Sequence, residues 1–219
     1  MKTALVLGGT GLTGKKIIRL LLADKRYNHV KVPVRTKMDI IYDKLDQIIF
    51  NYDEPNEAVL QADEVFCCLG STINNAGSNA AFYKVDFEYV LTCATIAKKL
   101  GAKKFVLMSA AGANKNSSIF YNSTKGKIEA AIMALGFETC IILRPSLLLG
   151  TRKEKRVAEI TAKLFITTFS FFVPAKYKAI ESKEVALAML YMTNNTSLSG
   201  VHIVENADIK KAAAMYPLA

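Results

Sequence analysis

Two side chains that could carry out acid–base chemistry occur in YNSTK, residues 121–125: the phenol of Tyr121 and the ammonium of Lys125. Residues four apart on a helix lie on the same face, so both would point the same way. A tyrosine phenol has an ordinary pKa of about 10, and a neighbouring ammonium lowers that pKa by favouring the phenolate. The pair could then act as general acid or base at a carbonyl or an alcohol. Taken alone, this spacing is common, and a helix-surface pair is its ordinary explanation.

A serine lies where it could assist such a tyrosine. LMSAAGA, residues 107–113, places Ser109 at the carboxyl end of an apolar strand pattern, one element before Tyr121. A serine hydroxyl there could hydrogen-bond a substrate oxygen beside the tyrosine. The sequence therefore indicates a group of three, Ser109, Tyr121 and Lys125.

A glycine-rich turn precedes these residues. In GGTGLTG, residues 8–14, the glycines Gly8, Gly11 and Gly14 follow an apolar strand pattern and open a helical one. Glycine lets the backbone turn tightly and approach a pyrophosphate, and a helix N-terminus presents free N–H groups to it. Glycine is also frequent at ordinary strand–helix turns. The position of the GGTGLTG motif, after the first strand of a chain in which strands and helices alternate, favours nucleotide binding.

The end of the second strand pattern bears on the choice of dinucleotide. An acid there bonds the ribose 2′-hydroxyl of NAD, whereas a base accommodates the 2′-phosphate of NADP. Here the strand runs into Arg35 and Lys37, and no acid precedes Asp39. We expect the forked donors of Arg35 to pair with a 2′-phosphate, so NADP is favoured over NAD. An exposed arginine at a strand end is the plainer interpretation.

The elements that would position these residues alternate along the chain. Apolar runs predict strands at 3–8, 30–35, 47–52, 64–70, 104–109, 139–145 and 200–205. Helical patterns separate them at 12–23, 80–100, 119–135, 152–172 and 182–194, with a short helix after Pro55. This alternation predicts an α/β fold with a parallel sheet covered on both faces, and its ligand site lies at the carboxyl ends of the strands. No repeat or long linker divides residues 1–219, so we expect a single domain.

Composition excludes several other classes. The net charge of +10 is spread over helices and loops without interleaved aromatic residues, so nucleic-acid binding is not expected. No apolar run is long enough to span a membrane, and no cysteine–histidine spacing fits a metal site. The cysteines Cys67, Cys68, Cys93 and Cys140 are expected to be buried and reduced. The N-terminus resembles a strand rather than a signal peptide, so a cytoplasmic location is expected.

Residues 1–150 contain five motifs, which follow one another as GGTGLTG, VFCCLGST, VLMSAAGA, YNSTK and RPSLLLG. Together they resemble the short-chain dehydrogenase/reductases of the extended or atypical type. More specifically, they resemble the NADPH-binding group that includes the human Tat-interacting tumour-suppressor oxidoreductase and its bacterial relatives. The resemblance implies a Rossmann-like doubly wound parallel sheet, bound NADPH and a Ser109–Tyr121–Lys125 triad.

The resemblance also implies roles for individual positions. A pyrophosphate would lie along Gly8, Thr10, Gly11, Leu12 and Thr13, with Gly14 completing the motif. Many dehydrogenases of this superfamily carry an asparagine in the helix after the fourth strand, where this chain has Val85-Asp86 and so departs from the family's proton relay. The remaining implied cofactor contacts are Arg35 at the 2′-phosphate, Tyr52 and Asp53 near the adenine, Cys68, Leu69, Gly70 and Lys125 along the ribose, and Arg144 with Pro145 near the nicotinamide.

The segment 151–180 is expected to supply a small C-terminal substrate-side region, with a core-facing helix or a dimer surface as the alternatives. Residues 206–219 form a tail, either a short helix or disordered. The expected ligand is a small carbonyl substrate reduced with NADPH. An NADPH-sensing protein that binds partners with little turnover, or a nucleotide-sugar epimerase or dehydratase, are alternatives. Related folds often pair through helices, so a homodimer is a further expectation.

Overall fold

Seven parallel strands form the centre of the molecule. The computed structural model describes residues 1–149 and 178–217. The sheet has the order β3-β2-β1-β4-β5-β6-β9, and every neighbouring pair is parallel. This order is that of a Rossmann-like fold with one added edge strand. The strands are β1 (Lys2–Leu7), β2 (Tyr27–Val34), β3 (Leu45–Ile49), β4 (Glu64–Cys67), β5 (Lys104–Met108), β6 (Thr139–Arg144) and β9 (Gly200–Glu205).

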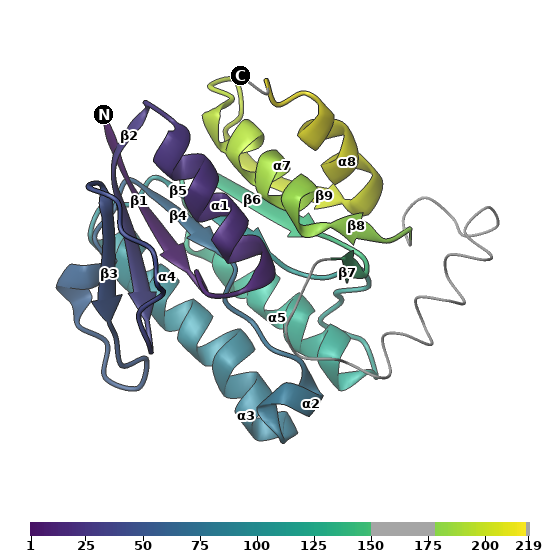
Figure 1. Cartoon of the computed structure of the whole chain (residues 1–219). Helices are drawn as coiled ribbons and strands as arrows, with labels where there is room; N and C mark the ends of the chain where they lie inside the picture. Colours follow the sequence, from purple (N-terminus) through teal and green to yellow (C-terminus); the bar gives the residue numbers. More distant parts are fainter. Residues whose placement is uncertain (150–177, 218–219) are drawn as a thin grey trace.

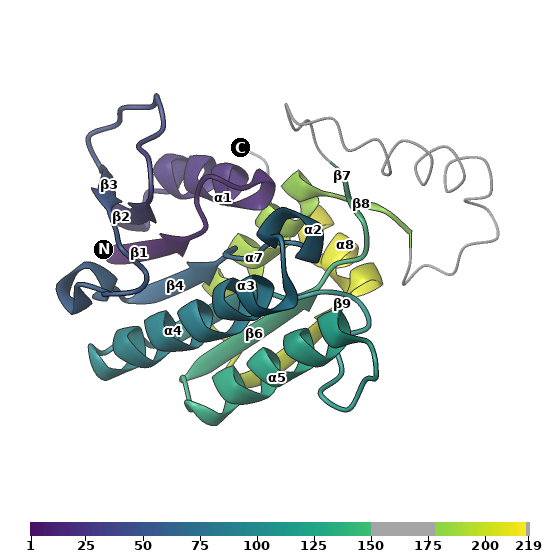
Figure 2. The same ribbon diagram turned by 90° about the horizontal axis from the view of Figure 1, so that it is seen from below.

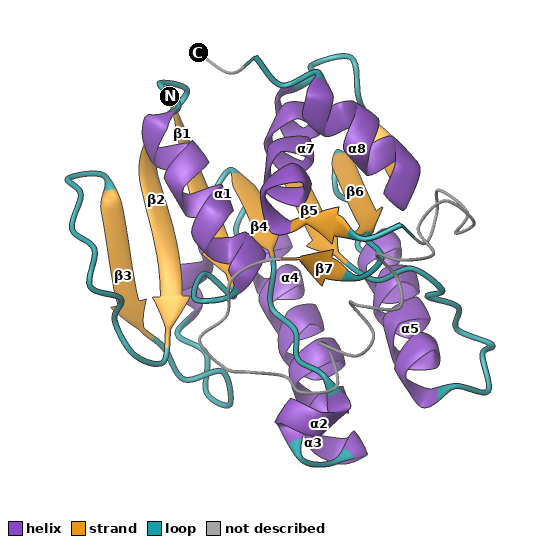
Figure 3. Cartoon of the chain, turned by 45° about the vertical axis from the view of Figure 1, so that its right-hand side comes forward, coloured by secondary structure: helices purple, strands orange, loops and turns teal. Residues whose placement is uncertain are grey.

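Helices cover both faces of this sheet (Figures 1 and 2). On one face lie α1 (Leu12–Ala23), α7 (Ser182–Asn194) and α8 (Asn206–Ala214). On the other lie α4 (Tyr89–Lys99) and α5 (Phe120–Ala134). Shorter elements are η1 (Glu57–Leu60), α2 (Ile73–Ala76), α3 (Asn79–Tyr83) and η2 (Lys84–Glu88). The short strand β7 (Leu148–Leu149) follows β6 (Figure 3) and pairs with β8 (Ile180–Glu181), which is labelled in Figures 1 and 2. No helix in residues 1–149 and 178–217 is long and apolar enough to cross a membrane.

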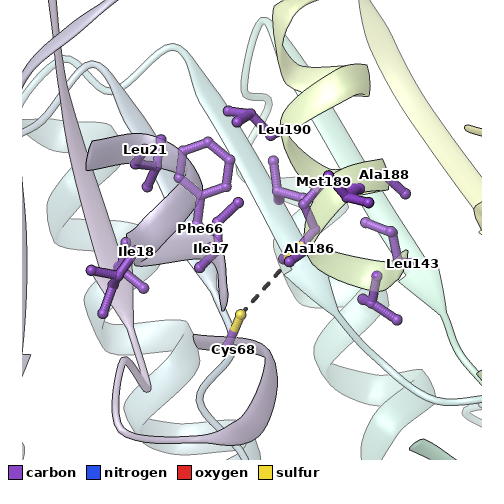
Figure 4. Close-up of a cluster of buried hydrophobic side chains, with 14 of the residues drawn as sticks. Ile17, Ile18, Leu21, Phe66, Cys68, Leu143, Ala186, Ala188, Met189 and Leu190 are labelled. Atoms are coloured by element: carbon purple, nitrogen blue, oxygen red, sulfur yellow. Dashed lines mark hydrogen bonds between the residues drawn. The ribbon is translucent and has the colours of Figure 1, made fainter. Parts of the chain in front are cut away.

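The two hydrophobic cores follow from the alternation of side chains along each strand. In β1, Val6 joins the core beneath α1 and α7, whereas Leu7 joins the core beneath α4 and α5. The adjacent Cys67 and Cys68 divide in the same way, and both thiols are free and buried. Figure 4 shows the first core, where Cys68 Sγ lies 3.9 Å from Sδ of Met189 on α7.

The predicted fold class is confirmed, and most elements lie where the sequence predicts them. Helices α1 and α7 have the predicted bounds, 12–23 and 182–194. The strand predicted at 47–52 is instead Leu45–Ile49, and the helix predicted at 80–100 is divided into α3, η2 and α4. Residues 206–214 of the predicted tail form helix α8, with Ile209 buried. The helix predicted at 152–172, and nearly all of the substrate-side segment 151–180, lie outside the described residues.

At the sheet edge where the strands begin, a buried carboxylate links the first residues of three strands. Glu64 of β4 accepts a hydrogen bond from the Tyr27 hydroxyl at 2.5 Å and forms an ion pair with Lys2 at 2.7 Å. Burial, together with the Glu64 carboxylate, raises the pKa of the Tyr27 phenol far above its usual value. Since Lys2 and Tyr27 begin β1 and β2, this network ties these strands together at their starts.

Close packing around Gly14 fixes the position of α1 against the glycine turn. A Cβ on Gly14 would lie 2.2 Å from the Gly8 carbonyl oxygen and 2.8 Å from the Gly9 Cα. Both neighbours are backbone atoms and cannot rotate away. Gly14 therefore lets the helix start directly on the turn that follows β1.

We expect Gly14→Ala to lower the free energy of unfolding by about 1–3 kcal/mol, measured by urea denaturation. Alanine favours a helix by about 1 kcal/mol over glycine, but the backbone overlap outweighs this gain. Gly11→Ala is the matched control, because its Cβ would lie 3.3 Å from its nearest neighbour, the Gly8 oxygen. Equal stability of the two variants would contradict this packing role.

Candidate cofactor and substrate cleft

A cleft of about 890 Å³ opens at the carboxyl ends of the central strands. The turns after β1, β2, β4, β5 and β6 all contribute to its lining. This is the sheet edge at which parallel α/β proteins bind ligands. The lining residues that the sequence predicts are Gly8, Thr10, Gly11, Leu12, Thr13, Arg35, Cys68, Leu69, Gly70, Ser109, Tyr121, Lys125 and Pro145.

The glycine turn is shaped to approach a phosphate closely. Gly8 has a φ of +76°, and a Cβ there would lie 2.5 Å from the Leu69 nitrogen, so a side chain would collide with the turn after β4. Thr13, in the first turn of α1, has a buried hydroxyl oxygen with no hydrogen-bond partner among the described residues. Buried polar atoms are normally paired, so this hydroxyl fits a pyrophosphate oxygen at the helix N-terminus. The residues of this turn therefore fit the pyrophosphate of a dinucleotide.

The structure separates the three residues expected around the adenosine end of the cofactor. Arg35 is exposed at the cleft and forms no ion pair within residues 1–149 and 178–217. Tyr52 stacks on Tyr89 with ring centroids 5.4 Å apart, and its burial raises its pKa. Asp53 is exposed, 2.6 Å from the Lys84 ammonium. Neither Tyr52 nor Asp53 belongs to the cleft lining, so only Arg35 of this group faces the cleft.

The turn after β4 forms another wall of the cleft. Cys68, Leu69 and Gly70 all line it, as predicted for residues along a ribose. The Cys68 sulfur contacts Met189 in the core, and burial raises the pKa of this thiol. The wall continues through Ser71 and Thr72, which end the VFCCLGST motif, and through Asn75, which no sequence motif indicates.

Helix α5 brings Tyr121 and Lys125 to the cleft on one face. The Tyr121 ring packs on Phe82 of α3, with ring centroids 5.3 Å apart. Lys125 is buried, and its Nζ lies 2.7 Å from Oδ1 of Asp86, also buried. Burial disfavours the ammonium, yet the pKa of Lys125 is raised, because Asp86 and Tyr121 together outweigh that desolvation. Lys125 therefore stands beside Tyr121 as a cation.

Ser109, directly after β5, is held by a second buried carboxylate. Its hydroxyl donates to Oε1 of Glu129 at 2.5 Å. Arg144 donates to both oxygens of Glu129, from Nη2 at 2.6 Å and from Nε at 3.1 Å, and its Nη1 lies 3.0 Å from Glu205. The Glu129 and Glu205 bonds keep the pKa of Arg144 above its ordinary value. Arg144, expected near the nicotinamide, instead directs its guanidinium to these carboxylates and does not line the cleft, whereas Pro145 does.

Gly14, Tyr52, Asp53 and Arg144 are thus the predicted cofactor residues that the structure leaves out of the lining. Sequence reasoning also missed Glu129 altogether. Spacing could have indicated it, because Glu129 follows Lys125 by the same four residues that separate Lys125 from Tyr121. Among the described residues, no cluster of His, Cys, Asp and Glu could hold a metal ion.

We expect Arg144→Leu to lower the free energy of unfolding by about 3–5 kcal/mol in urea denaturation, because it leaves the Glu129 charge buried without its partner. The double variant Arg144→Leu/Glu129→Leu is the control and should regain most of that loss, since no unpaired charge remains. An Arg144→Leu protein with unchanged stability but weakened NADPH binding would instead support the cofactor contact that the family resemblance implies.

Comparison with known proteins agrees with this geometry. Residues 8–195 match the NAD(P)H-binding family. Protein HTATIP2 of Rattus norvegicus is 32% identical over 214 residues, which cover 95% of this chain and 88% of the relative. A protein named FMP52, mitochondrial, of Eremothecium gossypii is 33% identical over 215 residues, covering 94% of this chain and 95% of the relative.

Solved structures share the fold at much lower identity. A UDP-N-acetylglucosamine 4-epimerase from Methanobrevibacter ruminantium superposes with a TM-score of 0.70 at 18% identity, covering 93% of this chain and 76% of that one. A UDP-glucuronic acid 4-epimerase from Bacillus cereus in complex with NAD gives 0.69 at 14% identity, covering 93% and 77%. With a glycine turn, a cleft that fits a dinucleotide, and relatives along nearly its whole length, this chain belongs to the NAD(P)H-binding family and is an atypical short-chain dehydrogenase/reductase of the HTATIP2 type.

Proposed function

We propose that this protein is an NADP(H)-dependent oxidoreductase that interconverts a small carbonyl compound and its alcohol. The observation that carries this proposal is that Ser109, Tyr121 and Lys125 line the same cleft as the glycine turn and Arg35. A nicotinamide bound there would donate or accept the hydride. The polypeptide then has to bind the cofactor, hold the substrate oxygen and move one proton.

Tyr121 is the proposed general acid and base. During reduction its phenol would protonate the oxygen that gains negative charge, and during oxidation the phenolate would take the proton back. The buried Lys125 ammonium beside it would stabilise the negative charge that develops on the phenol oxygen during the transfer. Phe82 packs on the Tyr121 ring and restricts its orientation.

Ser109 is proposed to hold the substrate oxygen next to Tyr121. Its proton is directed to Glu129 here, and the alcohol's single hydroxyl proton is the one that Tyr121 takes, so Ser109 would act as a hydrogen-bond donor to the substrate oxygen in both directions. Rotating the serine proton away from Glu129 would let Ser109 donate to that oxygen. Ser109 can in this way serve both directions of the reaction.

The preference for NADP over NAD is proposed from Arg35. An exposed guanidinium at the cleft, without an ion-pair partner in the described residues, suits a 2′-phosphate through two parallel hydrogen bonds. The epimerase neighbours were solved with NAD or with a nucleotide sugar, and this chain covers about three quarters of each of them. A small carbonyl is the proposed substrate class, because Ser109 and Tyr121 line the cleft where they would hold a carbonyl oxygen. The four free cysteines suit a reducing compartment, for which we propose the cytoplasm, although the fungal relatives are named mitochondrial.

We expect Tyr121→Phe to lower turnover of a carbonyl substrate by about 10²–10⁴-fold while NADPH affinity stays the same. Phenylalanine keeps the packing on Phe82 and removes only the hydroxyl. NADPH absorbance with a panel of aldehydes, ketones and quinones measures turnover, and Tyr83→Phe, which alters a ring stacked on Phe87 outside the cleft, is the matched control. Full turnover by Tyr121→Phe would refute the mechanism. Tight NADPH binding without turnover in any variant would favour a cofactor-sensing protein.

Arg35→Ala should weaken NADPH binding by about tenfold to a hundredfold and leave NADH binding nearly unchanged, because only NADPH carries the 2′-phosphate. Fluorescence titration of each cofactor gives the two dissociation constants. Arg19→Ala removes an exposed arginine of α1 outside the cleft lining and serves as the control for net charge. Equal losses for both cofactors would argue against a 2′-phosphate contact.

A further inference from the structure

Asp86 is a buried carboxylate, and apolar packing alone does not explain why a charged side chain is buried at this position. It lies in η2, the single π-helical turn between α3 and α4, where the Tyr89 N–H bonds back to the Lys84 carbonyl. Its side chain is fully buried, and one oxygen accepts the Ser71 N–H at 2.7 Å. π-helical turns are rare and occur often at functional sites.

The second oxygen of Asp86 is directed at Lys125. The 2.7 Å ion pair joins two side chains that are 0% and 7% exposed. Gly70 lies directly over this pair, since a Cβ there would be 3.0 Å from Asp86 Oδ1 and 3.4 Å from Lys125 Nζ. Because Gly70 and Lys125 both line the cleft, the ion pair lies immediately beneath its surface.

Within the part of the chain that the structure describes, Asp86 is the carboxylate that acts on the Lys125 ammonium. The titratable groups that act on its ammonium are Asp86 from η2, Tyr121 from α5 and Cys67 from β4. Burial raises the pKa of the Cys67 thiol to about 12, so that thiol carries no charge at neutral pH. A buried lysine without a carboxylate partner loses its proton at a pH several units below that of an exposed one.

We infer that Asp86 is a positioning residue, which keeps Lys125 protonated and aimed at the cleft beside Tyr121 over the whole working pH range. The inference rests on the proposed function for its catalytic consequence, but the charge of Lys125 can be measured without turnover. Without the carboxylate, the ammonium would become neutral within the working range, and Tyr121 would lose the cation beside it.

The test is a titration of the lysine side chains, followed by NMR of ¹³C-labelled ε-carbons, with Lys125→Gln assigning the Lys125 resonance. In the wild type this resonance should not titrate below about pH 10. In Asp86→Asn, which keeps an oxygen for the Ser71 N–H, its midpoint should fall by at least about one pH unit. Glu64→Gln breaks a different buried ion pair, at the far edge of the sheet, and should leave the Lys125 midpoint unchanged.

An unchanged Lys125 midpoint in Asp86→Asn would overturn the inference. If Asp86→Asn fails to fold, the wild-type titration decides by itself, because a midpoint well below that of an ordinary lysine would mean that Asp86 does not hold the proton. Where a carbonyl substrate turns over, kcat/KM of Asp86→Asn should decline with rising pH from a lower pH than in the wild type. Absence of turnover in every variant would refute the proposed function and leave the titration result standing.

Discussion

The cleft depends on the parallel arrangement of all seven main strands. In a parallel sheet every strand ends at the same edge. The turns after five neighbouring strands of this sheet, β2, β1, β4, β5 and β6, therefore meet around the cleft although they lie far apart in the sequence. Backbone contact between two of these turns sets how closely they meet: Gly8 lies against the backbone of Cys68 and Leu69. The glycine turn and the turn after β4 are therefore in direct backbone contact, which sets the distance between these two walls of the cleft.

Two buried carboxylates support this edge from beneath. Asp86 holds Lys125 from the π-helical turn, and Glu129 holds Ser109 from α5. Each carboxylate has compensation for its burial: Asp86 in the ammonium and the Ser71 N–H, Glu129 in the Arg144 guanidinium. Since a buried charge without a partner is strongly destabilising, these pairs resist rearrangement and keep the two polar side chains beside Tyr121 in fixed positions.

A third buried carboxylate, Glu64, lies at the opposite edge of the sheet. Glu64 is as buried as Glu129, and it too has a cation and a hydroxyl as partners. Its partners, Lys2 and Tyr27, lie at strand starts and outside the cleft lining, so we assign this network a structural role. In this fold, the sheet edge at which a buried carboxylate lies therefore decides whether it contacts residues of the cleft.

The sequence by itself determined the elements and their order, because apolar periodicity and glycine turns are local properties. Helices α1 and α7 have the predicted bounds, and Arg35 and Ser109, predicted at the carboxyl ends of strands, line one cleft with Tyr121 and Lys125. Tertiary structure decided which polar groups pair. Arg144 ends a strand as predicted, yet its guanidinium belongs to Glu129, and Asp86, a departure from the family pattern, is the partner of Lys125. Such pairings join residues distant in the chain and depend on side-chain direction and burial, which residue spacing along a single element does not encode.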